Sequence, residues 1–148
     1  MTETMTGGCQ CGRVRYTARE VDDQAYLCHC RMCQRASGGV SIAFKNVPRA
    51  HVTWAGAEPD LYASSAIARR GYCRDCGTPL TFAYLDSDNL DLTVGSFDEP
   101  GFFRPTSHFG MESWHPAWLD TRDLPAMRSD EHAPLVQRWE KAGGHQDD

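Results

Sequence analysis

The chain has 148 residues, which is enough for one ordinary domain with a buried core. Hydrophobic residues make up 41% and charged residues 24%, a balance typical of globular rather than disordered proteins. The net charge of -5 argues against a nucleic-acid-binding surface, which depends on clustered Lys and Arg. No apolar run approaches the roughly 20 residues that span a bilayer, so we expect neither nucleic acid nor a membrane as partner.

Alternating apolar and polar residues predict β-strands along much of the chain. In chain order, the candidate strands are residues 11–17, the alternating set Val40, Ile42 and Phe44, residues 51–54, 70–73 and 80–84, and the set Leu90, Leu92 and Val94. Gly, Pro, Asp and Asn between them predict tight β connections. The sequence therefore predicts a mainly β fold of small antiparallel sheets.

Helix is expected in only two places. Residues 32–36 predict a single turn, and residues 134–142 predict a short terminal helix. Ser129 or Asp130 is a possible N-cap for this second helix, and Gly143 and Gly144 would end it. No repeat, low-complexity run or linker divides the sequence, so we expect one domain over residues 1–148, with the short helix and tail at 129–148.

The seven cysteines lie in three tight clusters. These are Cys9 and Cys11; Cys28, Cys30 and Cys33; and Cys73 and Cys76. The stretch 1–8 is short and polar and does not resemble a secretory signal, so we expect a cytoplasmic protein. In the cytoplasm, cysteines more often bind metal or take part in catalysis than form disulfides. The C-x-C and C-x-x-C spacings let two sulfurs reach one ion. Zinc is favoured because an all-thiolate tetrahedral set suits it, and an iron–sulfur cluster is the alternative.

Glycines divide the clusters into two sites. Gly12 follows one cysteine pair and Gly77 another, and a glycine there lets the backbone turn with positive φ and direct an amide N–H at a sulfur. The middle cluster is followed instead by Gln34. We therefore predict a closed structural zinc site at Cys9, Cys11, Cys73 and Cys76. Its loss should loosen the fold, because the metal offsets the entropy of closing a long loop.

The middle cluster, Cys28, Cys30 and Cys33, then has three ligands and an open position, as in catalytic zinc sites. Two alternatives stay open. A histidine could complete a second structural site, and the candidates are His29, His51, His108 and His115, with His29 disfavoured because it should point away from its neighbours. The cysteines could also form a redox-sensing disulfide such as Cys28–Cys33.

Three thiolates make zinc a weak Lewis acid, so the open site is better suited to holding a substrate sulfur than to hydrolysis. This favours carbon–sulfur chemistry on a thiol. Arg31 and Arg35 flank the cluster and could pair with a substrate carboxylate, or only neutralise the anionic site. Ser37 and Gly38 could let a ligand approach the backbone, or form no more than a turn.

Several stretches resemble a known family. They are GGCQCGRVRY, CHCRMCQRASGG, RRGYCRDCGTPLTF and VGSFDEP, followed by HFGMESWHPAWLD and DLPAMR. Together they are similar to the glutathione-dependent formaldehyde-activating enzymes, a family that also includes centromere protein V. The resemblance runs from about Gly7 to about Arg128.

The resemblance implies a β-tent fold with two zinc ions, with the core of the domain at about residues 7–128. It assigns the structural ion to Cys9, Cys11, Cys73 and Cys76 and the catalytic ion to Cys28, Cys30 and Cys33. It also implies a carbon–sulfur lyase that adds glutathione to formaldehyde, giving S-hydroxymethylglutathione. Two other functions remain as alternatives: a lyase of this type with a different thiol, and a zinc-stabilised binding module without catalysis. The sequence does not predict the oligomeric state.

Other polar and aromatic residues are expected to be structural. We predict Trp54, Phe82, Tyr84 and Phe97 as core aromatics and favour structural roles for His108 and Trp118 over positions in the site. Asp86, Asp88 and Asp91 surround a predicted hairpin turn, where solvated carboxylates are the expected state.

Overall fold

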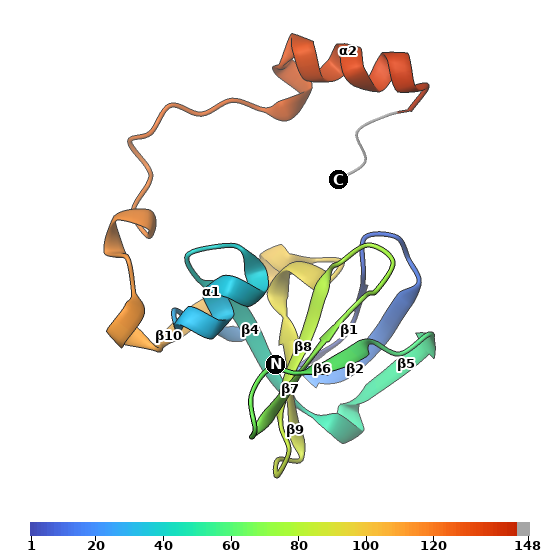
Figure 1. Cartoon of the computed structure of the whole chain (residues 1–148), viewed down its shortest axis with the longest axis vertical. Helices are drawn as coiled ribbons and strands as arrows, with labels where there is room; N and C mark the ends of the chain where they lie inside the picture. Colours follow the sequence, from blue (N-terminus) through green and yellow to red (C-terminus); the bar gives the residue numbers. More distant parts are fainter. Residues whose placement is uncertain (145–148) are drawn as a thin grey trace. The chain divides into compact units, whose positions relative to one another are not determined.

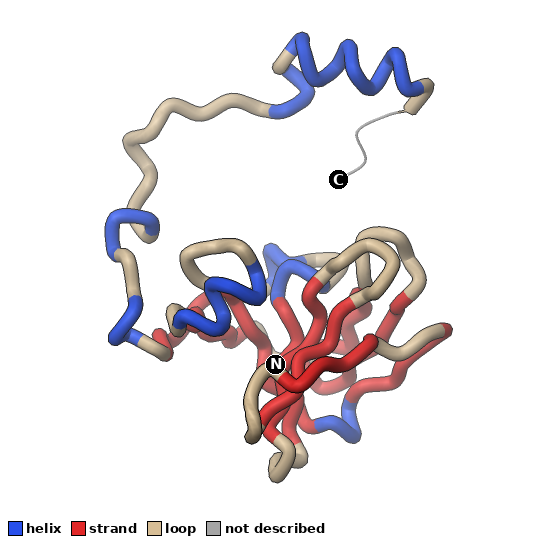
Figure 2. The backbone as a smooth tube through the Cα atoms, viewed as in Figure 1, coloured by secondary structure: helices blue, strands red, loops and turns tan. Residues whose placement is uncertain are grey.

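The computed structural model describes residues 1–144, and within them the protein is mainly β, with ten strands in two sheets and two α-helices (Figures 1 and 2). The prediction of a mainly β protein with little helix is confirmed. Two compact units separate after His115. That the whole chain forms one domain stays a prediction.

The first unit contains all ten strands. The smaller sheet has the strand order β1 (Glu3–Gly8), β2 (Val14–Val21), β5 (Val52–Gly56). The larger sheet has the order β10 (Arg104–Phe109), β3 (Gln24–Cys28), β4 (Ile42–Pro48), β9 (Asn89–Thr93), β8 (Pro79–Tyr84), β7 (Ala68–Tyr72), β6 (Asp60–Ala63). Neighbouring strands are antiparallel, as predicted, except that β10 runs parallel to β3.

The core lies between the two sheets. Tyr16 and Val21 of β2 belong to the same buried cluster as Leu90 and Leu92 of β9. Tyr16 and Ala18, two alternate residues of β2, face this core together with Val21, and burial of a side chain the size of Val or Leu contributes about 1.5–3 kcal/mol by leaving water. The Tyr16 hydroxyl hydrogen-bonds to the Ser96 hydroxyl at 2.8 Å, so its burial leaves no unpaired polar atom.

The two helices differ in detail from the prediction: the first is longer than expected, and the second has a different N-cap residue. The expected turn at 32–36 is α1 (Arg31–Ser37), which ends at Gly38 in the left-handed conformation. In the second unit, α2 (Ala133–Ala142) starts after His132, whereas Ser129 and Asp130 form a separate 3-10 turn. Gly143, with φ of 71°, ends α2 as predicted. No helix within residues 1–144 is long and apolar enough to cross a membrane.

Candidate functional site

Four sulfurs meet where two chain turns come together. Cys9 and Cys11 follow β1, and Cys73 and Cys76 lie between β7 and β8. Their sulfur atoms all lie within 4.8 Å of one another, with Cys9 to Cys11 at 3.6 Å and Cys11 to Cys73 at 3.7 Å. A tetrahedral zinc with Zn–S bonds of about 2.3 Å separates its sulfurs by about 3.8 Å. The four sulfurs therefore suit the donor set and spacing of a closed zinc site, although their role as ligands stays a prediction.

Glycines shape both turns of this group. Gly12 and Gly77 have φ of 81° and 79°, the positive φ predicted after each cysteine pair. Their own N–H groups donate to the carbonyl oxygens of Cys9 and Cys73, at 3.2 and 2.7 Å. Backbone groups of the residues directly after the glycines, Arg13 and Thr78, hydrogen-bond to Cys11 and Cys76, and the Val14 N–H lies 3.3 Å from Cys9 Sγ. The glycines therefore close the turns, and residues beyond them contact the sulfurs.

Cys28, Cys30 and Cys33, the cysteine trio, form the second group. Cys28 ends β3, Cys30 is the N-cap of α1, and Cys33 lies in the first turn of that helix. The backbone N–H of Cys33 donates to Cys30 Sγ at 3.3 Å, so the helix cap itself positions these two sulfurs. The three sulfurs lie within 4.8 Å of one another, and in the described part of the chain no fourth Cys, His, Asp or Glu ligand atom joins them.

The histidine next to the trio points elsewhere, as expected. His29 is buried, and its Nε2 lies 2.8 Å from Nδ1 of His108. Burial lowers the pKa of His29, with the neighbouring His108 adding to the effect. The Gln34 side-chain amide donates to three carbonyl oxygens within 3.2 Å, including those of His29 before α1 and Ser113 after it, and so ties α1 to the segments on both sides. Among residues 1–144, no His nitrogen joins the three sulfurs, and the open three-ligand site stays a prediction.

Arg70 of β7 supplies a cation to the trio. Its Nη2 donates to Cys33 Sγ at 3.2 Å, and its guanidinium lies 4.9 Å from the centre of the Phe82 ring. A hydrogen bond with the Cys28 thiol, together with those from Arg70 and Cys30, outweighs burial and lowers the pKa of the Cys33 thiol to about 5. The same contact with Cys33 raises the pKa of Cys28. These contacts favour the thiolate form at Cys33 over Cys28.

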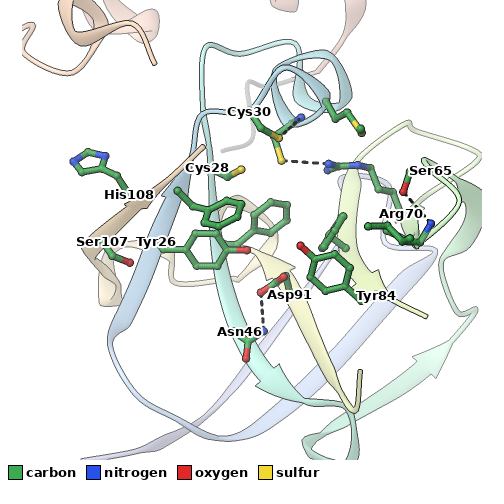
Figure 3. A pocket seen from close by; sticks show the side chains of 17 residues that line it. Tyr26, Cys28, Cys30, Asn46, Ser65, Arg70, Tyr84, Asp91, Ser107 and His108 are labelled. Atoms are coloured by element: carbon green, nitrogen blue, oxygen red, sulfur yellow. Dashed lines mark hydrogen bonds between the residues drawn. The ribbon is translucent and has the colours of Figure 1, made fainter. Parts of the chain in front are cut away.

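A cavity of about 470 Å³ opens beside the trio, whose three cysteines form part of its wall (Figure 3). Aromatic side chains from the larger sheet form another part: Tyr26, Phe44, Phe82 and Tyr84. Asn46 and Asp91 lie on the opposite side of the Tyr26 ring from the cysteines (Figure 3). The volume is in the range of small-molecule sites.

Some of the aromatic and acidic residues have positions at this cavity that differ from the sequence prediction. Phe82 and Tyr84, predicted as core aromatics, line it, whereas Trp54 and Phe97 pack in the core as expected. Asp91, predicted as solvated, is 7% exposed because it lies within β9, opposite Asn46 of β4. Asp86 and Asp88 lie in exposed positions of the turn before β9, as predicted.

The residues predicted to contact substrate lie elsewhere. Arg35, Ser37 and Gly38 are at the end of α1, and none of them is among the residues that line the cavity. The Ser37 hydroxyl donates to the Cys33 carbonyl oxygen at 2.9 Å and Gly38 caps the helix, so both have structural contacts. A substrate role for these three residues stays a prediction. His108 does line the cavity, although the structural role was favoured for it, and Trp118 is exposed in the second unit.

Comparisons with known proteins agree with this architecture. The glutathione-dependent formaldehyde-activating enzyme family matches residues 4–113, so the chain belongs to this family. The matched region covers nearly all of the first unit and stops short of the Arg128 limit expected from the sequence motifs.

Two individual proteins are similar to the chain. An uncharacterized lyase of Schizosaccharomyces pombe (strain 972) is 31% identical over 83 residues, which are 56% of this chain and 60% of the relative. The chain thus spans about 60% of that relative's length. A crystal structure of a Rhodobacter sphaeroides protein is similar in fold, with a TM-score of 0.56 and 21% identity over 70% of this chain and 99% of the other. The relative is named as a lyase, and the family is named for activating formaldehyde with glutathione.

Proposed function

We propose that this protein is a zinc-dependent carbon–sulfur lyase that adds glutathione or a similar thiol to formaldehyde or another small carbonyl, like an S-(hydroxymethyl)glutathione synthase. One observation carries the proposal: three cysteine sulfurs lie together in the wall of a cavity, without a fourth ligand among residues 1–144. Such a set is typical of metal sites that accept an exogenous ligand. Family membership supports the same conclusion. We further propose a cytoplasmic location.

The donor set fits zinc, because thiolates arranged around one point suit its tetrahedral coordination. When bound, the ion would supply a fourth position for the substrate sulfur and favour its thiolate form. Arg70 offsets part of the negative charge of the trio through its bond to Cys33, so that a second anion is repelled less. The α1 cap and the Gln34 amide hold the ligand-bearing segment in place.

The addition itself needs few groups. The lone pair of the thiolate sulfur forms the carbon–sulfur bond, and the carbonyl π pair moves to oxygen. That oxygen then takes up a proton equivalent to the one that the thiol released. Exposed Met32, Ile67 and Phe109 line the cavity, which therefore opens to water that can deliver this proton.

The four-cysteine site is proposed to be structural. It joins the β1–β2 connection to the β7–β8 connection, 62 residues apart between Cys11 and Cys73. We expect two zinc ions per chain, with the ion at the trio removed first by a chelator. The more open site should lose its metal faster because a competing ligand can enter the vacant position.

A matched pair of variants tests the division of roles. Cys30→Ser removes one sulfur of the trio but keeps a good N-cap for α1, so the fold should survive. Cys73→Ser should lower the unfolding temperature much more, because Cys73 is fully buried in the structural site. Exchange NMR with labelled formaldehyde and glutathione should show acceleration over buffer for the wild type and none for Cys30→Ser.

The opposite results would contradict the proposal. They are equal destabilisation by the two substitutions, or turnover that survives Cys30→Ser. A preparation with one tightly bound zinc and with Cys28, Cys30 and Cys33 all reactive towards a thiol reagent would instead favour a zinc-stabilised binding module.

A further inference from the structure

The cavity carries little positive charge for a substrate with two carboxylates. Among the described residues that line it, Arg70 is the single Lys or Arg, and that guanidinium already contacts Cys33 Sγ and the Phe82 ring. Arg31 donates to Gln34 and, like Arg35, is not part of the lining. A tripeptide such as glutathione, with two carboxylates, would have to bury them or leave them outside the cavity, and burying an unpaired carboxylate is costly.

The side of the cavity away from the cysteine trio carries a negatively charged group instead. Asp91 is the single carboxylate of the lining within residues 1–144, and it is 7% exposed. Asn46 donates to its Oδ1 at 2.9 Å, and Tyr26 hydrogen-bonds to it as well. Because an ionised carboxylate has about four acceptor positions, Asp91 can still accept from a ligand. Burial raises the pKa of Asp91 even though Asn46, Tyr26 and the charge of Arg70 act against it, so a bound cation would relieve a remaining cost.

The space between Asp91 and the trio is bounded by aromatic rings. Phe44 and Phe82 have ring centres 6.3 Å apart, and Phe82 and Tyr84 lie edge to face at 5.0 Å. The rim is apolar too: Met32, Ile67 and Phe109 are 55%, 64% and 60% exposed. Large apolar side chains gathered at a cavity mouth indicate an apolar ligand, and aromatic faces favour rings and organic cations.

We propose that this cavity selects a substrate with an apolar, preferably aromatic, body that ends in an ammonium or another hydrogen-bond donor, in preference to glutathione. The sulfur end lies at Cys28, Cys30 and Cys33, the body lies along Tyr26 and Phe82, and the donor end reaches Asp91. The position of the sulfur end rests on the proposed function. The choice of body and donor rests on the cavity wall alone.

Two benzyl thiols of one size test this selectivity. In calorimetric titrations of the zinc-loaded full chain, 4-(aminomethyl)benzyl thiol should bind at least about tenfold more tightly than 4-(mercaptomethyl)benzoate and than glutathione. Asp91→Asn, which keeps the shape and the contact with Asn46, should bring the ratio of the two benzyl thiols close to one. Asp86→Asn is the matched control, because Asp86 is exposed and outside the lining, and it should leave the ratio unchanged.

Sulfur-free probes separate this inference from the proposed function. Benzylamine should bind more tightly than benzoate to the wild type, and by the same ratio to Cys30→Ser, because neither probe needs the trio. If Asp91→Asn fails to fold, this ratio still tests the selectivity of the cavity. Preference for benzylamine without binding of any thiol would support the cavity assignment and contradict the lyase. Thiol binding that favours glutathione or the benzoate, or a ratio unaffected by Asp91→Asn, would overturn the inference and leave the lyase standing.

Discussion

Arg70→Met is the substitution that most directly perturbs the support of the cysteine trio. Arg70 is 6% exposed and donates to Cys33 Sγ at 3.2 Å, so its removal leaves a buried thiolate without its cation. A hydrogen bond to a charged group contributes about 1.5–3 kcal/mol, and loss of groups that support metal ligands typically lowers metal affinity about 10- to 100-fold. Met preserves most of the side-chain volume without adding an unpaired donor. We therefore expect zinc at the trio to bind about 10- to 100-fold more weakly.

Chelator competition, monitored with a zinc indicator, measures this change separately for the two ions of each chain. The four-cysteine ion should be unaffected, since Arg70 contacts none of its ligands. Arg69→Met is the control on the same strand: Arg69 donates to the carbonyl oxygens of Ser65 and Ala68 and not to a sulfur. Zinc binding at the trio that is as tight in Arg70→Met as in Arg69→Met would refute this role for Arg70.

Two further predictions concern stability. Hydrogen bonds from Arg15 and Thr6 lower the pKa of Asp98 to about 2, below its ordinary value of 3.8, so its stabilising effect is full above about pH 4 and is lost as the pH falls through about 2. Urea unfolding of wild type and Asp98→Asn should thus give midpoints that differ near neutral pH and converge in acid, and a gap that widens in acid would be inconsistent with this pairing. Leu92→Ala, at a fully buried core position, should cost about 2–5 kcal/mol in the free energy of unfolding, and a loss below 1 kcal/mol would mean that the two sheets do not share this core.

Strands with regular alternation were predictable from the sequence, whereas β1, β3, β6 and β10 were missed. Six predicted strands correspond to β2, β4, β5, β7, β8 and β9. Strand β10 was missed because all six of its residues are exposed and one is Pro105, so burial imposes no pattern on it. Strand β1 does bury alternate residues, Met5 and Gly7, but its Thr residues and two glycines gave no clear apolar alternation in the sequence.

The cysteine groups were predictable because short spacings and the following glycines have local geometric consequences. The positive φ of Gly12 and Gly77 is such a consequence, whereas the acceptor of each N–H depends on how the turn closes. The cavity was not predictable, since it depends on pairing between distant strands. Asp91 alternates with Leu90 and Leu92, and this alternation indicates that its side chain lies on the other face of β9. That this second face is also buried follows only from the pairing of β9 with β4.

The proposed activity requires a metal that is held by the cysteine trio and has one position left for a substrate sulfur. A crystal structure of the zinc-loaded protein at the zinc absorption edge, with and without bound thiol, tests it most directly. We predict an ion bound by Cys28, Cys30 and Cys33 whose remaining ligand is exchanged for the thiol sulfur. An ion enclosed by four protein atoms and unchanged by thiol, or a fully metallated sample with no ion there, would contradict the account.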